Sequence, residues 1–200
     1  MSKPVDPGEM SSTRPETRNG AFIESLERLV QRKDRGALAA LRRGLGQPPG
    51  EVAQMYPYVV PWLPQHAVTP RKEDAYYQIA ALFAFWYQGR SSFLRNGRIP
   101  NNLGASLARL ADATASESVE RRFVALLNCH SEDLPDHLRH AVGLLRTADI
   151  PVDWDQLLRD IQDWGREDRR VQRSWARSYW GHGPRDTDQG PISAVVSSES

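Results

Sequence analysis

The sequence predicts an all-α protein made of two small helical bundles joined by a loop. Between residues 20 and 181 the apolar side chains recur at helical spacing, and no run of β-branched residues alternates with polar ones as in a strand. Capping residues, glycines and prolines divide this region into helices of ordinary length. A chain of 200 residues with 40% hydrophobic side chains is also long enough to bury a core.

The predicted N-terminal bundle covers residues 20–98. Its first helix is predicted from apolar residues about one turn apart, namely Phe22, Leu26, Leu29 and Val30. Asp34 is the expected N-cap of a second helix, which we expect to stop at Gly46. The inward residues of that helix are predicted to be Leu38, Leu41 and Leu45.

A proline-rich segment follows, and it leads into the most apolar helix of the sequence. The prolines of residues 47–70 permit only short helical turns. Thr69 and Pro70 then form a typical helix start, with proline at the first helical position. Because this helix is apolar nearly all round, we expect it at the buried centre of the bundle.

The predicted C-terminal bundle covers residues 99–181. A loop at residues 88–102 spans the boundary between the two bundles. We expect one helix around Leu103–Leu110, a second capped by Thr114 with Glu117, and a third opened by Pro135. Asp153 with Gln156 is the expected cap of the last helical stretch. Continuous helical phase predicts that residues 153–180 form one long helix or two nearly collinear helices.

The two ends of the sequence lack a periodic apolar face. Residues 1–19 and 182–200 are therefore predicted to be disordered tails. No signal peptide and no membrane-spanning run is evident, and the single cysteine, Cys129, permits no internal disulfide. These features predict a cytoplasmic protein with no membrane contact.

The charge composition favours a local basic face over a globally basic protein. The sequence holds 26 basic and 25 acidic residues, and only three of the basic residues are lysines. Without the predicted tails the net charge is +3, which is mild. Most cations are thus guanidinium groups, which bind phosphates in a planar, bidentate way.

The clearest basic pattern lies in the last helical stretch. On a helix, five arginines fall within an arc of about 100°, opposite Val171, Trp175 and Tyr179. Such a strip could follow the phosphates of a nucleic acid, although a solvated charged face explains it as well. The five residues are Arg166, Arg169, Arg170, Arg173 and Arg177.

Further arginines occur in pairs and in the predicted loop. Arg90, Arg95 and Arg98 accompany Phe93 there, a combination that would suit either a clamp on a flexible strand or a hinge. The pairs are Arg42–Arg43 and Arg121–Arg122.

The sequence offers little for catalysis or metal binding. It has no phosphate-binding glycine loop, no nucleophile elbow and no evident pair of catalytic carboxylates. The spacing of Cys129, His130, His137 and His140 matches none of the common zinc frameworks. We therefore predict a protein that is not an enzyme and that binds no metal or other cofactor.

Seven short segments follow one another along residues 20–180. They are Ala37–Gly44, Tyr77–Ala84, Asn102–Leu110, Val119–Leu127, Asp133–Arg139, Trp154–Asp160 and Val171–Arg177. In this order they resemble the CasB family, the small subunit of the type I-E CRISPR surveillance complex called Cascade. Each segment is weak alone, and their order makes the resemblance specific.

The resemblance implies a non-catalytic helical subunit, present as two copies in a ribonucleoprotein. Its implied partners are the crRNA, the target DNA and the backbone and large subunits of Cascade. Its implied role is to stabilise the guide–target heteroduplex and the displaced strand, the R-loop, in antiviral defence. The basic residues that fall within the family segments are Arg42, Arg43, Arg121, Arg122, Arg139 and Arg177. The loop around Arg90–Arg98 lies outside these segments.

Two other functions remain open at this stage. One is a helical adaptor that binds only protein, through exposed aromatics such as Trp62, Tyr179 and Trp180. The other is a metal-dependent hydrolase that uses the histidine cluster.

Overall fold

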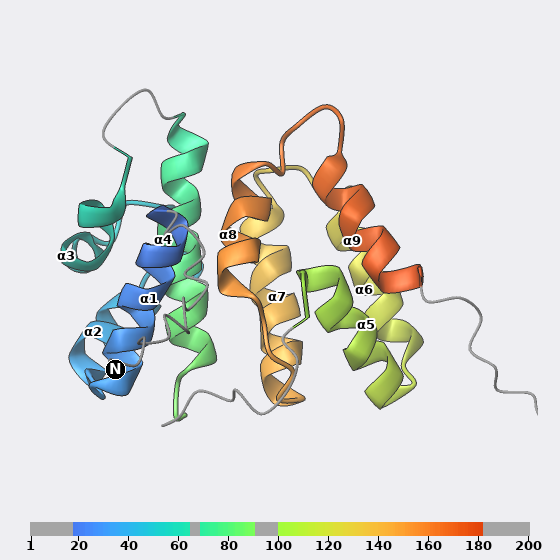
Figure 1. Cartoon of the computed structure of the whole chain (residues 1–200), viewed down its shortest axis with the longest axis horizontal. Coiled ribbons are helices and arrows are strands. Elements are labelled where there is room, and N and C mark those ends of the chain that lie inside the picture. Colours follow the sequence, from blue (N-terminus) through green and yellow to red (C-terminus); the bar gives the residue numbers. More distant parts are fainter. Residues whose placement is uncertain (1–17, 65–68, 91–99, 182–200) are drawn as a thin grey trace, which may run out of the picture.

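The computed structural model describes residues 18–64, 69–90 and 100–181, and within these ranges every regular element is a helix (Figure 1). This confirms the predicted all-α class. The elements are α1 (Arg18–Gln31), α2 (Arg35–Arg42), the short turns η1 (Ala53–Met55), α3 (Tyr56–Val59) and η2 (Val60–Trp62), α4 (Pro70–Trp86), α5 (Leu103–Thr114), α6 (Glu117–Asn128), α7 (Leu134–Thr147), α8 (Trp154–Gln162) and α9 (Arg170–Trp180).

Some predictions fall on residues that are not described. Residues 1–17 and 182–200 of the predicted tails lie outside the described residues, as do residues 91–99, which hold Phe93, Arg95 and Arg98. The last two residues of the predicted N-terminal tail belong to α1, where Asn19 accepts a hydrogen bond from the Tyr76 hydroxyl at 2.7 Å.

The central helix is α4, as its sequence predicts. Its apolar residues are buried nearly all round, and Figure 1 shows it between the α1–α2 pair and α8. The C-terminal end of α4 packs on α8. There the centroid of the Trp154 ring lies 5.5 Å from that of Phe83 and 6.2 Å from that of Trp86. The buried side chains therefore form one continuous core across the predicted domain boundary. The division into two bundles, at residues 98 and 99, stays a prediction.

Thr69 precedes α4 and Pro70 is its first residue, as predicted. Of the other predicted helix caps, two are confirmed and one is wrong. Asp34 and Asp153 each accept a backbone hydrogen bond at 2.9 Å from the residue three positions later. Ser116, not Thr114, is the N-cap of α6, since its hydroxyl accepts from the Ser118 N–H at 3.3 Å. The reason is Ala115, whose left-handed φ of 46° ends α5 and delays the start of α6.

The second predicted helix is shorter than expected. α2 ends at Arg42, and Gly46 lies beyond it in a turn, with a φ of +78° that glycine adopts without strain.

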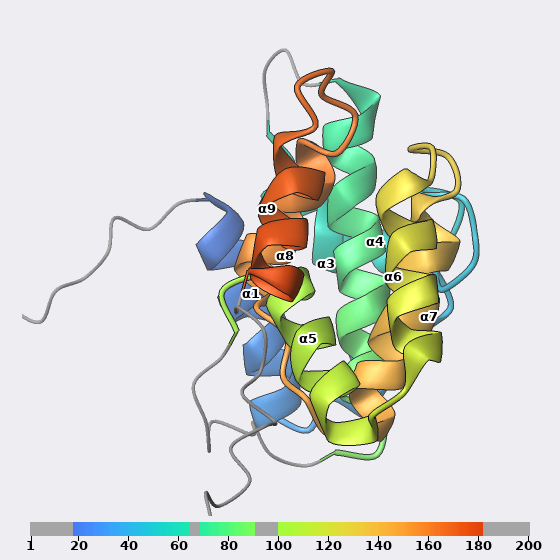
Figure 2. The ribbon, with the colours of Figure 1, turned by 90° about the vertical axis from the view of Figure 1, so that its right-hand side faces the viewer.

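The expectation of one long or two collinear helices over residues 153–180 is also wrong. α8 and α9 form a hairpin, in which the chain turns back through residues 163–169 (Figures 1 and 2). Arg169 adopts a left-handed φ of 47°, and a right-handed α-helix cannot continue through a residue in this conformation. The Trp164 and Trp175 rings lie 5.0 Å apart across the hairpin, and burying both favours the turn over an extended helix.

Candidate nucleic-acid interface

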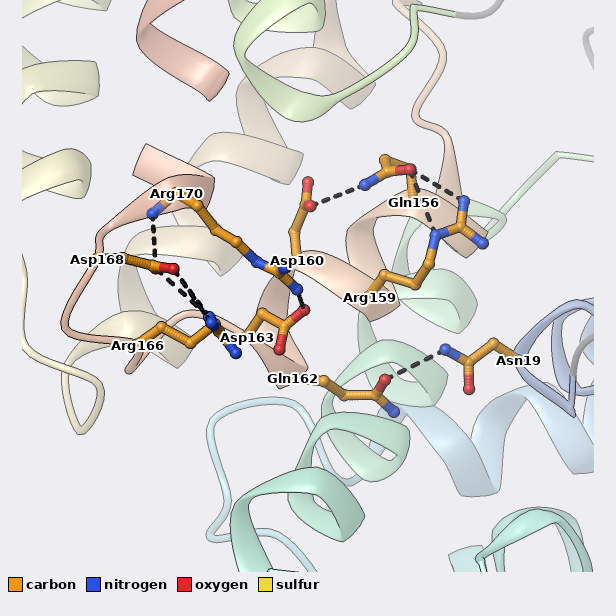
Figure 3. Close-up of polar contacts among 9 residues, drawn as sticks. All are labelled: Asn19, Gln156, Arg159, Asp160, Gln162, Asp163, Arg166, Asp168 and Arg170. Carbon is orange, nitrogen blue, oxygen red and sulfur yellow. Dashed lines mark hydrogen bonds and ion pairs between the residues drawn. The ribbon is translucent and has the colours of Figure 1, made fainter. Parts of the chain in front are cut away.

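The inner face of α9 is fixed by a buried hydrogen bond to α8. The Trp175 indole is fully buried, and its Nε1 donates to the Asp160 carboxylate Oδ2 at 2.6 Å. Gln156 donates from Nε2 to the other oxygen, Oδ1, at 2.8 Å (Figure 3). Burial raises the pKa of Asp160 above its usual value of 3.8, while these hydrogen bonds and the charge of Arg159 act in the opposite direction.

The same face of α9 packs against α5 at very short range, and Figure 2 shows the two helices together. Gly104 lies against the backbone of Trp175, so a Cβ at Gly104 would overlap the Trp175 carbonyl group. Asn102 caps α5 by accepting from the Ala105 N–H at 3.0 Å and donates to the Ser178 hydroxyl at 2.8 Å. α9 is therefore held from two sides, by α8 and by α5.

The hairpin loop carries a small network of charges (Figure 3). Arg166 donates to Asp168, with Nη2 and Oδ2 3.1 Å apart, and Arg170 forms an ion pair with Asp163. The Arg170 backbone N–H also donates to Asp168 Oδ1 at 3.2 Å. The Arg166 hydrogen bond, followed by that from Arg170, lowers the pKa of Asp168 below 3.8. Much of the charge of this loop is thus neutralised locally.

Arg169 and Arg173 are oriented by backbone carbonyls. Arg169 Nη2 donates to the Leu127 carbonyl at 2.7 Å, so this cation lies at the C-terminal end of α6, where the helix dipole favours it. Arg173 Nη2 donates to the Asp168 carbonyl at 2.6 Å. A guanidinium has five N–H donors, so each of these contacts leaves most of them for a ligand.

The outward side of α9 combines cations with an aromatic ring. At 100° per residue, Arg170, Arg173, Arg177 and Trp180 fall within about 80° of each other. All four are exposed, and we call this set the outer face of α9. Residues 171–180 contain no carboxylate, so the positive charge of the outer face is least opposed around Arg173 and Arg177. Within the described ranges, no side chain forms an ion pair with Arg177.

The structure confirms the predicted phase of α9 but not a five-residue stripe. Val171, Trp175 and Tyr179 are buried opposite Arg173 and Arg177, as predicted. Arg166 and Arg169 precede the helix, so they belong to the hairpin loop and its corner. The adaptor alternative instead assumed an exposed Tyr179, and this is wrong, since only 7% of Tyr179 is exposed. Trp62, which it also used, is half-buried.

The remaining candidate arginines lie on other parts of the molecule. Arg42 and Arg43 are at the end of α2, far from α9 along the long axis in Figure 1. The Arg139 guanidinium of α7 reaches the turn at Gly46, close to the end of α2, and Asp136 lies 3.9 Å from it. The ten candidate arginines therefore do not form one continuous surface.

The arginines of α6 are exposed, and one of them borders a groove. Arg122 helps to line an apolar groove of about 380 Å³ between α5, α6 and α7, together with His137 and His140. Arg121 is exposed on the same helix.

Of the arginines in the predicted loop, Arg90 lies within the described residues, and its guanidinium already has partners in the protein. Arg90 lies 4.9 Å above the Trp86 ring, donates to the Arg146 carbonyl at 2.6 Å and pairs with Asp149. These contacts fix Arg90 to α4 and to the end of α7.

The described histidine and cysteine residues show no arrangement typical of a metal centre. In the part of the chain that is described, no three His, Cys, Asp or Glu side chains converge as metal ligands would. Burial raises the pKa of the Cys129 thiol to about 11, helped by the charge of Asp133, so the thiol stays protonated at neutral pH. None of the described helices is long and apolar enough to span a bilayer.

Sequence reasoning missed the break at residues 163–169 and the close contact at Gly104. Gly165 and Asp168 were the available signals for the break, since glycine often ends a helix and aspartate often caps the next one. The partner of Gly104 is 71 positions away in the sequence, and no local pattern indicates it.

The comparisons with known proteins agree with this architecture. The family model of the CRISPR-associated protein Cse2 matches residues 37–180. The CRISPR-associated protein Cse2 of Thermus thermophilus is 35% identical over 171 residues, which are 84% of this chain and 93% of that protein.

Solved structures give the same result. The crystal structure of M. ruber CasB is 34% identical, with a TM-score of 0.69 over 82% of this chain and 93% of that one. A chain of a CRISPR RNA-guided surveillance complex is 32% identical, with a TM-score of 0.70 over 81% of this chain and 91% of that one. The chain described here therefore belongs to the CRISPR-associated Cse2 family, which is also called CasB.

Proposed function

We propose that this chain is a non-catalytic small subunit of a type I-E Cascade complex and that it binds nucleic acid through the outer face of α9. Its relatives include a chain of a CRISPR RNA-guided surveillance complex, and this supports a role as a Cascade subunit. Its partners are the crRNA, the target DNA, the backbone and large subunits, and a second copy of itself.

The outer face of α9 is the observation that carries the proposal. Arg173 and Arg177 are one helical turn apart on a helix whose other side is fixed by Trp175 and Gly104. Guanidinium groups on a rigid element bind phosphates with little further loss of conformational freedom. Such contacts are independent of sequence, as they must be where the guide RNA reads the target.

Contacts of this kind suit R-loop formation. Opening the target exchanges DNA base pairs for RNA–DNA base pairs at nearly balanced free energy. Additional backbone contacts to the heteroduplex or to the displaced strand therefore shift the equilibrium towards the open state. We assign this role to the outer face of α9, with Arg121, Arg122, Arg139 and the α2 pair Arg42–Arg43 as further candidates.

A salt titration tests the proposal. The full chain carrying Arg173→Gln and Arg177→Gln is compared with wild type for DNA affinity between low and moderate salt. Each lost phosphate contact should flatten the slope of log affinity against log salt by about 0.7–0.9. Arg28→Gln with Arg32→Gln is the matched control, because both residues are exposed in the α1 region, remote from α9.

The outcome separates nucleic-acid binding from an adaptor function. The adaptor alternative is favoured by the exposed apolar residues Val124 and Trp180. It predicts no salt-dependent DNA binding by the wild-type chain. Equal slopes for wild type and the Arg173/Arg177 variant would remove the outer face of α9 from the mechanism. In the assembled complex, we expect the same variant to open a matched target less stably while the guide-pairing rules stay unchanged.

A further inference from the structure

Trp180 is the large aromatic side chain that the described structure leaves exposed at the end of the outer face of α9. Of its surface 44% is accessible, although the two aromatic residues that contact it, Phe123 and Tyr179, are buried. Exposing this much of an indole forgoes hydrophobic stabilisation. The ring is therefore accessible to a ligand, and covering it would recover that stabilisation.

The exposed ring is held rigidly from beneath. Its centroid lies 5.3 Å from that of Phe123 on α6 and 4.8 Å from that of Tyr179, and Tyr179 itself stacks on Phe123 at 4.3 Å. Three rings in mutual contact leave the indole little rotational freedom. A rigid aromatic surface loses little entropy when a flat ligand stacks on it.

The surroundings favour an anionic ligand that has flat groups. Arg177 lies one turn before Trp180 on the same face of α9, and Arg173 lies one turn before Arg177. A row of cations that ends on an exposed aromatic ring matches the alternation of phosphate and base in a single strand.

We propose that Trp180 is a stacking platform for an unpaired base of a single-stranded nucleic acid whose phosphates contact Arg177 and Arg173. In a duplex the faces of the internal bases are covered by their neighbours, so Trp180 gains nothing from paired DNA. The arginines contact the phosphates of either form. Trp180 thus gives the outer face of α9 a preference for unpaired strands. This inference rests on the proposed function and adds specificity to it.

The test compares strands with and without bases. Wild type and Trp180→Leu, as full chains, are titrated with labelled oligothymidylate, with an abasic strand of equal length and with a duplex. Leucine keeps apolar packing on Phe123 and lacks an aromatic face. We expect Trp180→Leu to weaken oligothymidylate binding by about 5- to 100-fold and to leave abasic-strand and duplex binding within about twofold. Trp180→Phe should restore most of the lost affinity.

Two comparisons control the experiment. Tyr56→Leu removes an aromatic residue of similar exposure, 43%, on α3 at the other end of the molecule, and it should change none of the three affinities. Thermal melting of Trp180→Leu and Trp180→Phe establishes that both variants are folded. If Trp180→Leu is unstable, Trp180→Met takes its place with the same expected losses, because methionine also packs on Phe123 and has no aromatic face.

Each contrary outcome has its own meaning. Equal losses on the abasic strand and on oligothymidylate, or no loss on either, would overturn stacking. If Arg173→Gln with Arg177→Gln then still weakened binding, the proposed function would stand without Trp180. Wild-type affinity for all DNA forms, combined with failure of Trp180→Leu to enter the complex, would assign the ring to a protein partner and also overturn stacking. A wild-type chain that bound none of the three DNAs would overturn both proposals.

Discussion

The inner and outer faces of α9 are held in place by different kinds of contact. On the inner face, Trp175 is fully buried, donates to Asp160 and touches the backbone of Gly104. On the outer side, Arg166, Arg170 and their carboxylate partners form exposed ion pairs in and beside the hairpin loop. Exposed pairs contribute little to stability, whereas a buried aromatic ring contributes several kcal/mol.

The difference separates stability from binding along a single helix. Changes on the inner face alter the position of α9, and changes of the exposed arginines Arg173 and Arg177 alter mainly what the helix can contact. These two arginines can therefore be replaced to test function without unfolding the protein. The predictions below examine this contrast, beginning with the largest expected effect.

The largest contrast is expected between Trp175 and Arg173. Trp175→Ala should lower the free energy of unfolding by about 3–5 kcal/mol, because it leaves a cavity and removes the partner of Asp160. Arg173→Ala should lower it by less than about 0.5 kcal/mol, because the residue is exposed. Chemical denaturation of both variants measures the difference, and equal losses would disprove the assigned helical phase.

Gly104→Ala should be the next most damaging change. Its Cβ would meet the backbone carbonyl of Trp175, which cannot move aside as a flexible side chain could. We expect a loss of about 3 kcal/mol, at the upper end of overpacking effects. Gly143→Ala is the control, since its nearest neighbour is the Phe85 ring at 3.9 Å, and alanine favours the helix there. Denaturation midpoints that fell equally for both glycines would show that the α5–α9 contact is not tight.

The two carboxylates provide a smaller contrast. Asp160→Ala should cost about 2 kcal/mol, because the buried Trp175 Nε1 and the Gln156 amide lose their acceptor. Asp168→Ala removes an exposed acceptor of Arg166 and should change the melting temperature little. If Asp168→Ala lost more stability than Asp160→Ala, the loop contacts rather than the buried hydrogen bonds would be the main stabilisation of the hairpin.

The same carboxylates should respond oppositely to pH. The pKa of Asp160 is raised in the folded state, so the folded protein keeps a proton that the unfolded chain releases above pH 3.8. This group therefore makes stability fall as pH rises from 3.8 to its folded pKa. The pKa of Asp168 is lowered, so its contribution is present above pH 3.8 and is lost as pH falls through the folded value.

Asn substitutions isolate the two contributions. Unfolding free energies of wild type, Asp160→Asn and Asp168→Asn should be measured at closely spaced pH values on both sides of 3.8. Asp160→Asn should remove a decrease above that value, and Asp168→Asn should remove an increase below it. Profiles that are parallel to wild type for both variants would contradict the assigned pKa directions.

Local patterns predicted much of the fold. The caps at Asp34 and Asp153, the buried α4 and the burial of Trp175 opposite Arg173 all depend on residues within one or two helical turns of each other. The hairpin could not be predicted from helical phase alone, because Trp164, in the loop, keeps the helical spacing of the apolar residues of α8. Its partner, Trp175, lies on the other side of the turn.

The candidate site was less predictable for the same reason. A helical wheel placed Arg166 and Arg169 in line with Arg173, but the left-handed residue Arg169 separates loop from helix. The sequence also could not indicate that Leu127 supplies a carbonyl to Arg169, or that Phe123 supports Trp180. These contacts join α6 to α9 and depend on the tertiary fold.

The contact between α5 and α9 also constrains when the protein can fold during synthesis. The hydrogen bond from Asn102 to Ser178 joins residues 76 positions apart. At about 5–20 residues per second, α5 leaves the ribosome several seconds before its partner helix exists. During that interval the side of α5 around Gly104 lacks the helix that packs on it in the folded protein. A chain interrupted before α9 would thus lack both the arginines of the outer face and the helix that packs on α5.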